Sequence, residues 1–245
     1  TLNPRDICIL SRNRPDRYTE SLKNELSKLG IKSRLESDLQ DILAEPICLL
    51  IISFLRLSIE DRSPQDWDII IDYLLSINGI NDESKSRAIE KKLEEDLKVL
   101  KDMIRNLTCI SEETVAEVIR NVLIFLNTDK LKIEYRQYSQ GNYLDDIVEK
   151  IINGLYNSFN CNNWCKALNE FEGLDSIPIM TIHKSKGLEY HTVVFVGLED
   201  SALWGFNNNP QSETCSFFVA FSRAKKRVIF TLSQQRPDNY GRIRN

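Results

Sequence analysis

The sequence predicts an α/β fold, a parallel sheet flanked by helices, which is interrupted by an all-helical insertion. Short, β-branched apolar runs of the kind found in buried parallel strands occur near both ends of the chain. They cover residues 6–11, 31–35, 177–182, 192–197 and 228–232. Between the second and third runs the apolar residues recur at helical steps of three and four instead. We therefore expect one sheet domain assembled from two distant parts of the chain.

The first part reads as strand, helix, strand, an order typical of α/β domains. The strand at residues 6–11 is followed by Pro15-Asp16, a suitable helix start, and Gly30 is a suitable residue just past the helix end. A second short strand follows at residues 31–35. A further helix over residues 45–58 begins with Pro46 at its first turn and has a broad apolar face, so we expect it to be mostly buried.

The chain changes character near Asp61. Five amphipathic helices are predicted from there to Phe171, and they cover residues 64–76, 84–107, a segment after Ser111, residues 142–158 and a segment from Trp164. Ser111-Glu-Glu-Thr is a candidate capping box. We assign residues 1–61 plus 174–245 to the sheet domain and 62–173 to the helical insertion. The charged stripes of the insertion fit solvated faces, and a partner or DNA surface is the second interpretation.

Composition limits the kinds of protein that fit. The net charge of −4 argues against a uniformly basic nucleic-acid-binding protein, although a local basic stripe can still bind phosphates. The longest apolar run, residues 47–57, is too short for a membrane span and contains Arg56. None of the 6 cysteines forms a CxxC pair, which favours free thiols and a cytoplasmic protein. Because the chain opens at Thr1 directly before a strand, we expect a fragment of a longer protein.

The end of the chain combines aromatic and basic residues. A helix is predicted over residues 213–225, with Phe217, Phe218 and Phe221 buried and a basic cluster at residues 222–227. Before it, an irregular stretch carries Trp204 and Phe206. These two side chains fit either core packing or stacking on nucleic-acid bases.

The densest set of chemically useful residues lies between the strands at 177–182 and 192–197. It comprises His183, Lys184, Lys186, Gly187 and Glu189. Ligands of open α/β sheets bind at strand ends, so this segment indicates an edge that faces phosphate or nucleic acid. A different stretch, residues 79–86, resembles a phosphate loop, but no strand precedes it and the sequence contains no intact GxxxxGK[ST].

Three segments together resemble the UvrD/Rep/PcrA-type superfamily 1 DNA helicases. Thr181-Ile-His-Lys-Ser-Lys-Gly-Leu-Glu-Tyr190 resembles their motif V, Val219-Ala-Phe-Ser-Arg-Ala-Lys225 their motif VI, and Ile9-Leu-Ser-Arg12 their motif IV. The resemblance implies the second RecA-like domain of that family, called 2A, with a short helical 2B insertion. The phosphate loop and the Mg²⁺-binding acidic pair belong to the first RecA-like domain, which this chain does not contain. The chain would thus supply half of an ATP site.

The resemblance also implies roles at the nucleotide. Arg223 would be the arginine finger at the γ-phosphate, because its planar, permanently charged group suits a developing phosphoryl charge. Arg12 would be a second γ-phosphate sensor, while Arg14 and Arg17 fit solvated turn charges better. Glu189 would accept a hydrogen bond from the ribose, and Gly187 would permit close approach of the backbone.

Other residues of the resemblance would face DNA. Thr181 and His183 would contact the backbone of single-stranded DNA without reading bases. Lys184 and Lys186 fit equally well as phosphate contacts and as solvated charges.

The implied function is that of the C-terminal motor domain of an ATP-dependent 3′→5′ DNA helicase. Its cofactors would be ATP and Mg²⁺, bound mainly by the absent first domain, and its partners that domain and single-stranded or duplex-junction DNA. On its own, the chain is expected to be inactive. The alternative is a helicase-like DNA-sensing or regulatory module that works with a nuclease partner in defence or repair.

Overall fold

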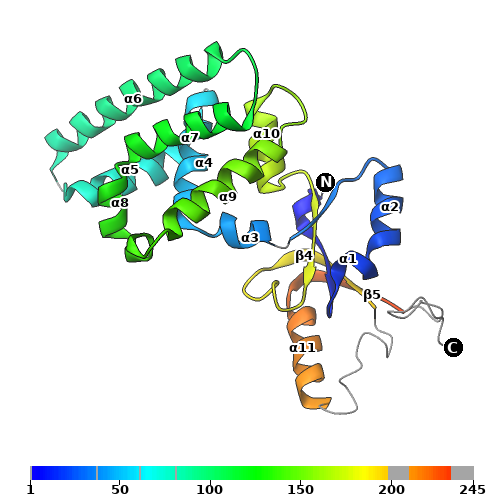
Figure 1. Cartoon of the computed structure of the whole chain (residues 1–245). Coiled ribbons are helices and arrows are strands. Elements are labelled where there is room, and N and C mark those ends of the chain that lie inside the picture. The colour runs from blue at the N-terminus through cyan, green and yellow to red at the C-terminus, as the bar shows by residue number, and fades with distance from the viewer. Residues whose placement is uncertain (1, 37, 61, 81, 198–209, 233–245) are drawn as a thin grey trace. The chain divides into compact units, whose positions relative to one another are not determined.

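The computed structural model describes residues 2–36, 38–60, 62–80, 82–197 and 210–232 (Figure 1). The chain forms two compact units. The sheet unit comprises Thr1–Ser37 and Gly173–Asn245, and the helical unit comprises Asp38–Glu172. The predicted α/β class is confirmed, since the described residues of the sheet unit form a five-stranded, all-parallel sheet with helices.

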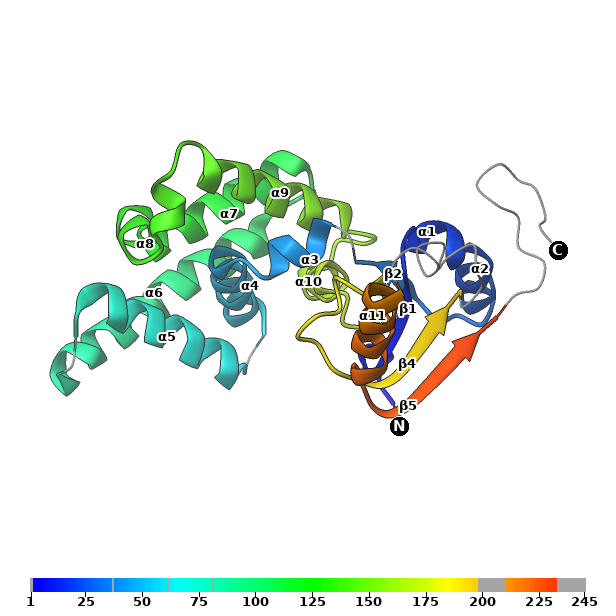
Figure 2. The same cartoon turned by 90° about the horizontal axis from the view of Figure 1, so that it is seen from below.

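The strand order is β2-β3-β1-β4-β5. Figure 2 shows β1, β4 and β5 side by side in this order. The strands are β1 (Ile7–Ser11), β2 (Ser33–Leu35), β3 (Ile177–Thr181), β4 (Tyr190–Val196) and β5 (Ala224–Thr231). The central strand β1 comes from the first part of the chain, and both of its neighbours come from the last part. In register, Ser11 pairs with Thr181 on β3 and Ile7 pairs with Thr192 on β4. This pairing holds the two distant parts of the chain in one sheet.

Both faces of the sheet are covered, which explains the continuous apolar runs. Cys8 and Leu10 face the side on which α11 (Pro210–Ser222) packs, while Ile9 faces the opposite side. On that opposite side lie α1 (Pro15–Tyr18) and α2 (Glu20–Lys28), which contribute Tyr18, Leu22 and Leu26 to the core. The predicted single helix is therefore two, because the chain leaves helical geometry at Thr19. The short 3-10 helix η1 (Pro4–Asp6) precedes β1 and contacts β3 and β4.

The helical unit is built around α4 (Pro46–Ile59), which is mostly buried, as predicted. The other elements are α3 (Asp38–Leu43), α5 (Pro64–Asn78), α6 (Glu83–Asn106), α7 (Glu112–Leu126), α8 (Thr128–Glu134), η2 (Arg136–Ser139), α9 (Tyr143–Asn157) and α10 (Trp164–Glu172). The capping box is confirmed, since Ser111 Oγ accepts from Thr114 N at 3.2 Å and Thr114 Oγ1 accepts from Ser111 N at 2.9 Å. Within the described residues, no helix is both long enough and apolar enough to cross a membrane.

The observed division of the chain differs from the expected boundary at residue 61. Helix α4 packs against α5, α6, α7 and α10, so the helical unit begins at Asp38. The end of the chain also differs from expectation. Helix α11 ends at Ser222, and the residues that follow it form β5. Of the phenylalanines expected to be buried, Phe218 is 66% exposed and Phe221 is 51% exposed.

Candidate functional site

The segment that connects β3 to β4 organises the candidate site. These strands are parallel and lie on opposite sides of β1, so the connection must run from the carboxyl edge of the sheet back to the amino edge. Parallel strands are usually joined by a helix for this reason. Here residues 182–189 make the connection without a helix, through a turn over residues 182–187. Ile182 and Leu188 pack on the same face of the sheet as Cys8 and Leu10. We call residues 182–189 the crossover.

Backbone hydrogen bonds hold the crossover in one conformation. Ile182 N donates to Ser11 O at 3.0 Å, which ties its start to β1. Ser185 N then donates to Thr181 O at 3.2 Å, and Leu188 N to Ser185 O at 3.0 Å. The Ser185 side chain is fully buried and donates to Ile182 O at 2.7 Å. Ser185 was not predicted as a site residue because a serine between two lysines resembles any polar turn.

The carboxyl edge collects one group of predicted residues. Thr181 is the last residue of β3 and pairs with Ser11, so Arg12 leaves β1 beside it. The Thr181 hydroxyl accepts from Lys184 N at 3.4 Å. His183 is exposed, while Arg12 and Lys184 are half-buried. The structure thus brings a hydroxyl, an imidazole and two cations to neighbouring backbone positions.

The amino edge collects the second group. Gly187 has a φ of +85°, a left-handed value that favours glycine, and nothing lies within 4 Å of a Cβ placed there. Glu189 follows immediately before β4, and its carboxylate lies 3.4 Å from Lys225 Nζ. Both side chains are more than half exposed, at 61% for Glu189 and 57% for Lys225. Lys225 was missed among the site residues because the basic cluster was expected to lie on a helix. Lys186 is exposed in the turn before Gly187.

Arg223 joins the two segments that resemble motifs V and VI. Its Nη1 donates to Leu188 O at 3.1 Å, Nε to Val219 O at 3.0 Å and Nη2 to Ser222 Oγ at 3.0 Å. In return, Tyr190 N donates to Arg223 O at 2.8 Å. The guanidinium is therefore held half-buried against the end of the crossover. Each of these acceptors is neutral.

The predicted residues do not converge on one point. Arg12 leaves the carboxyl end of β1, whereas Arg223 precedes β5 at the amino edge. The five residues of β1 alone separate these edges by about 17 Å. The γ-phosphate role of each arginine stays a prediction, and this separation is the observation that bears on it. Thr181 and Glu189, only eight positions apart in sequence, also lie at opposite edges.

A buried pair lies beneath the amino edge. Burial raises the pKa of the Cys8 thiol, and a hydrogen bond with Tyr190 only partly offsets this. Burial likewise raises the pKa of Tyr190, with a further contribution from Cys8. Both groups therefore stay neutral at physiological pH. In the described ranges, no group of three or more His, Cys, Asp and Glu side chains is arranged to hold a metal ion. Trp204 and Phe206 lie outside the described residues.

The sequence of this chain is similar to those of known proteins. Residues 77–235 match the model of the UvrD-like helicase C-terminal domain. The ATP-dependent DNA helicase Rep of Buchnera aphidicola subsp. Baizongia pistaciae is 29% identical over 179 residues, which cover 68% of this chain and 23% of that protein. Rep of Escherichia coli (strain K12) is 37% identical over 76 residues, 29% of this chain and 11% of that protein.

A third relative has a different name. The RecBCD enzyme subunit RecB of Chlamydia pneumoniae is 42% identical over 67 residues, which cover 27% of this chain and 6% of that protein. The chain thus spans less than a quarter of the length of each of these relatives. The family match nevertheless covers more than half of the chain and includes both segments that meet at Arg223. The chain belongs to the UvrD-like helicase C-terminal domain family.

Proposed function

We propose that the chain is the second motor domain of an ATP-dependent DNA helicase that moves 3′→5′ along one strand. The observation that carries the proposal is the contact between Arg223 and the Leu188 carbonyl, which joins the two motif-like segments at the amino edge. Relatives named ATP-dependent DNA helicase Rep support the same class of activity. In the whole protein, ATP would supply the phosphoryl transfer that drives movement.

At the nucleotide edge, Arg223 would act as the arginine finger. Its present partners are neutral backbone and hydroxyl oxygens, and an anionic phosphate oxygen would add the attraction of opposite charges to the hydrogen bond. Exchange of partners would therefore be favourable. The exposed pair between Glu189 and Lys225 is worth only about 0–1 kcal/mol, so the Glu189 carboxylate is available to a ribose hydroxyl. Mg²⁺ would be held by the other RecA-like domain of the parent protein.

At the carboxyl edge, Thr181, His183 and Lys184 would hold the backbone of single-stranded DNA, and the exposed Lys186 further along the same turn would add a phosphate contact. Hydroxyl, imidazole and ammonium groups bind phosphates without reading sequence. The separation of the two edges favours the same role for Arg12, in place of γ-phosphate sensing. The crossover would connect both edges as one hydrogen-bonded segment. A displacement at Glu189 would then alter the grip of Thr181, as a two-state element requires.

The finger role is tested in the full-length protein. Arg223→Ala should lower DNA-stimulated ATPase activity about 10³-fold or more and leave single-stranded DNA affinity intact. Arg227→Ala is the matched control, since Arg227 is an exposed arginine of β5, the strand that begins directly after Arg223. Near-normal turnover of Arg223→Ala, or an equal loss in Arg227→Ala, would refute the assignment. The isolated chain is expected to have no ATPase activity.

The assignment of Arg12 is tested by salt dependence. Arg12→Ala should weaken single-stranded DNA binding and reduce the slope of log affinity against log salt by about 1. Its ATPase activity at saturating DNA should remain. Lost turnover with unchanged DNA affinity would instead restore Arg12 to the γ-phosphate.

A second candidate function is a helicase-like sensing or regulatory module that works with a nuclease partner in defence or repair. The identity to a subunit of the RecBCD enzyme favours considering a chain that acts inside a complex. A strand-displacement assay of the full-length protein separates the two functions. DNA-dependent ATP hydrolysis without strand displacement would favour the sensing module.

A further inference from the structure

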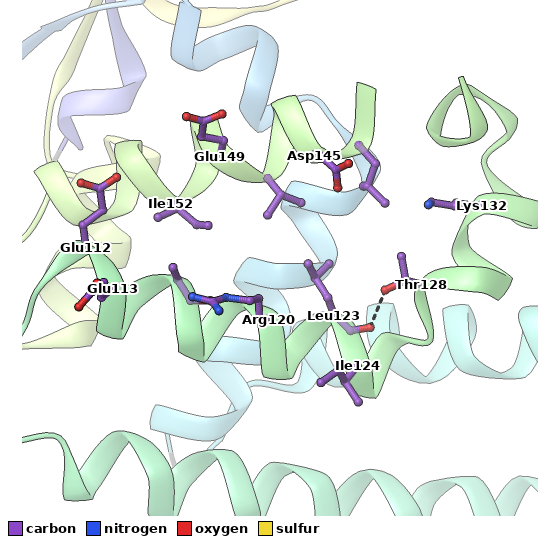
Figure 3. A pocket seen from close by; sticks show the side chains of 13 residues that line it. Glu112, Glu113, Arg120, Leu123, Ile124, Thr128, Lys132, Asp145, Glu149 and Ile152 are labelled. Carbon is purple, nitrogen blue, oxygen red and sulfur yellow. Dashed lines mark hydrogen bonds between the residues drawn. The ribbon is translucent and has the colours of Figure 1, made fainter. Parts of the chain in front are cut away.

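We propose that a groove between α7 and α9 of the helical unit docks a basic amphipathic helix of a partner protein. This inference is independent of the proposed motor role. The groove is a cavity of about 710 Å³. It is lined by Glu112, Glu113, Ala116, Arg120, Leu123, Ile124, Thr128, Lys132, Leu144, Asp145, Val148, Glu149 and Ile152 (Figure 3). We call it the α7–α9 groove.

The groove has the length of a short helix. Glu112 and Ile152 lie at one end and Ile124 and Asp145 toward the other, so α7 and α9 run in opposite directions along it (Figure 3). From Glu112 to Ile124 the twelve helical steps of α7 span about 18 Å. Three turns of an added helix would fill this length. Two packed helices present such a trough wherever a third helix does not cover them.

The floor of the groove is apolar. Leu123, Val148 and Ile152 are partly buried and pack against the core of the helical unit, which fixes their position. Ile124 is 70% exposed on the wall of the groove. Covering these side chains would remove apolar surface from water at about 25 cal/mol per Å². The groove therefore offers an anchor row for leucine-like side chains at helical spacing.

The rim is acidic. Glu112, Glu113, Asp145 and Glu149 line the groove together with only two cations, Arg120 and Lys132. Across the described part of the chain, no ion pair is formed by any of these four carboxylates. Three of them lie in the first turns of α7 and α9, where a carboxylate also complements the helix dipole. Glu149 lies in the second turn of α9, where the helix dipole does not account for a carboxylate.

The apolar floor and the acidic rim together indicate which kind of partner fits the groove. A nucleic-acid backbone would be repelled, since four carboxylates outnumber two cations at the rim. A helix with leucine-like residues on one face and Lys or Arg beside them matches both floor and rim, as in other helix-in-groove complexes. Complementary charge at such a rim sets specificity and association rate more than affinity. The floor must therefore carry most of the binding energy.

The test begins with a displayed library of 14-residue helices with Leu on one face and flanking positions randomised among Lys, Glu and Gln. The chain is the bait, and binders to Ile124→Asp are removed. Lys should be enriched at the flanking positions. Enrichment of Glu or Gln, or no enrichment over the starting library, would overturn the proposal.

The enriched peptide is then synthesised and measured by fluorescence anisotropy. Its affinity should fall at least tenfold for Glu149→Lys and for Ile124→Asp. It should be unchanged for Glu117→Lys, because Glu117 is an exposed carboxylate of α7 outside the groove. Circular dichroism checks that every variant is folded. Equal affinity for all variants would refute the site. Self-association of the chain that Ile124→Asp abolishes would assign the groove to a second copy instead.

Discussion

Replacement of Gly173 by alanine should destabilise the sheet unit strongly, for a reason that a second glycine can isolate. Gly173 has a φ of +69°, and a Cβ there would lie 2.5 Å from Arg34 Cζ. The Arg34 guanidinium is not free to move aside. It donates from Nη2 to both carboxylate oxygens of Glu36, at 2.8 and 3.1 Å, and from Nε to Oε1 at 3.1 Å. Gly173 and Glu36 lie next to the two points where the chain passes between the units.

Two contributions add up to the expected loss. The left-handed conformation costs a non-glycine residue about 1–2 kcal/mol, and the lower entropy of the unfolded alanine chain offsets about 0.4–1 kcal/mol of that cost. Displacing Arg34 leaves Glu36, whose side chain is 7% exposed, without its cation, at about 3–5 kcal/mol. Gly173→Ala should thus lower the free energy of unfolding by about 4–6 kcal/mol. Gly30→Ala, with a φ of +71° and no neighbour within 4 Å, should cost only about 1 kcal/mol.

Hydrogen exchange at the buried amides of Ile9 and Ile179 measures this stability within the sheet unit. The comparison is repeated in a background that lacks both Arg34 and Glu36 side chains, replaced by alanine. There Gly173→Ala should cost about as much as Gly30→Ala, since only the backbone strain remains. Equal losses for the two glycines in the native background would refute the clash. If Gly173→Ala costs as much stability in the double-alanine background as in the native one, the ion pair between Arg34 and Glu36 is not the cause of the loss.

Three further predictions concern single side chains. Tyr138→Phe should destabilise the helical unit by about 1–3 kcal/mol in urea unfolding followed by circular dichroism, because the hydroxyl donates to Glu45 at 2.8 Å and accepts from Ile47 N at 3.2 Å; an unchanged midpoint would show that this network contributes nothing. Burial raises the pKa of the Cys48 thiol from 9.0 to about 12, so stability should fall between these pH values as the unfolded chain loses its proton first, and Cys48→Ala should flatten that fall. Lys225→Ala should change the melting temperature little, since its ion pair is exposed, and a large drop would contradict the solvent-screened geometry.

Local patterns were sufficient where burial alone determines an element. The β-branched runs at residues 6–11 and 177–182 became β1 and β3 because both faces of those strands are covered. The broad apolar face of α4 predicted its burial but not the unit that buries it. Hydrophobicity specifies that a surface is covered, whereas the covering element depends on long-range packing. The same limit applies to Phe218 and Phe221. Their spacing fits a helix, but no core of the described residues covers their side chains.

The candidate site shows a different limit. Its residues were found from motif-like segments, but their placement depends on strand order, which no local pattern contains. Residues 177–182 and 192–197, separated by a short polar stretch, look like neighbouring strands. The insertion of β1 between β3 and β4 is a pairing across more than 160 positions of sequence. That one pairing sends Thr181 and Glu189 to opposite edges.

The crossover therefore has a mechanical consequence that a pair of independent loops would lack. Its first residue is bonded to Ser11 on β1, and its Leu188 carbonyl accepts from Arg223. Between these points the buried Ser185 donates to Ile182 O and accepts from Leu188 N through its own carbonyl. A ligand that draws Arg223 away from Leu188 removes one anchor and leaves the other on the central strand. In the proposed motor, the loss of this one anchor would let the crossover shift, and the shift would reach Thr181 at its other end and alter the grip of Thr181 on the DNA strand.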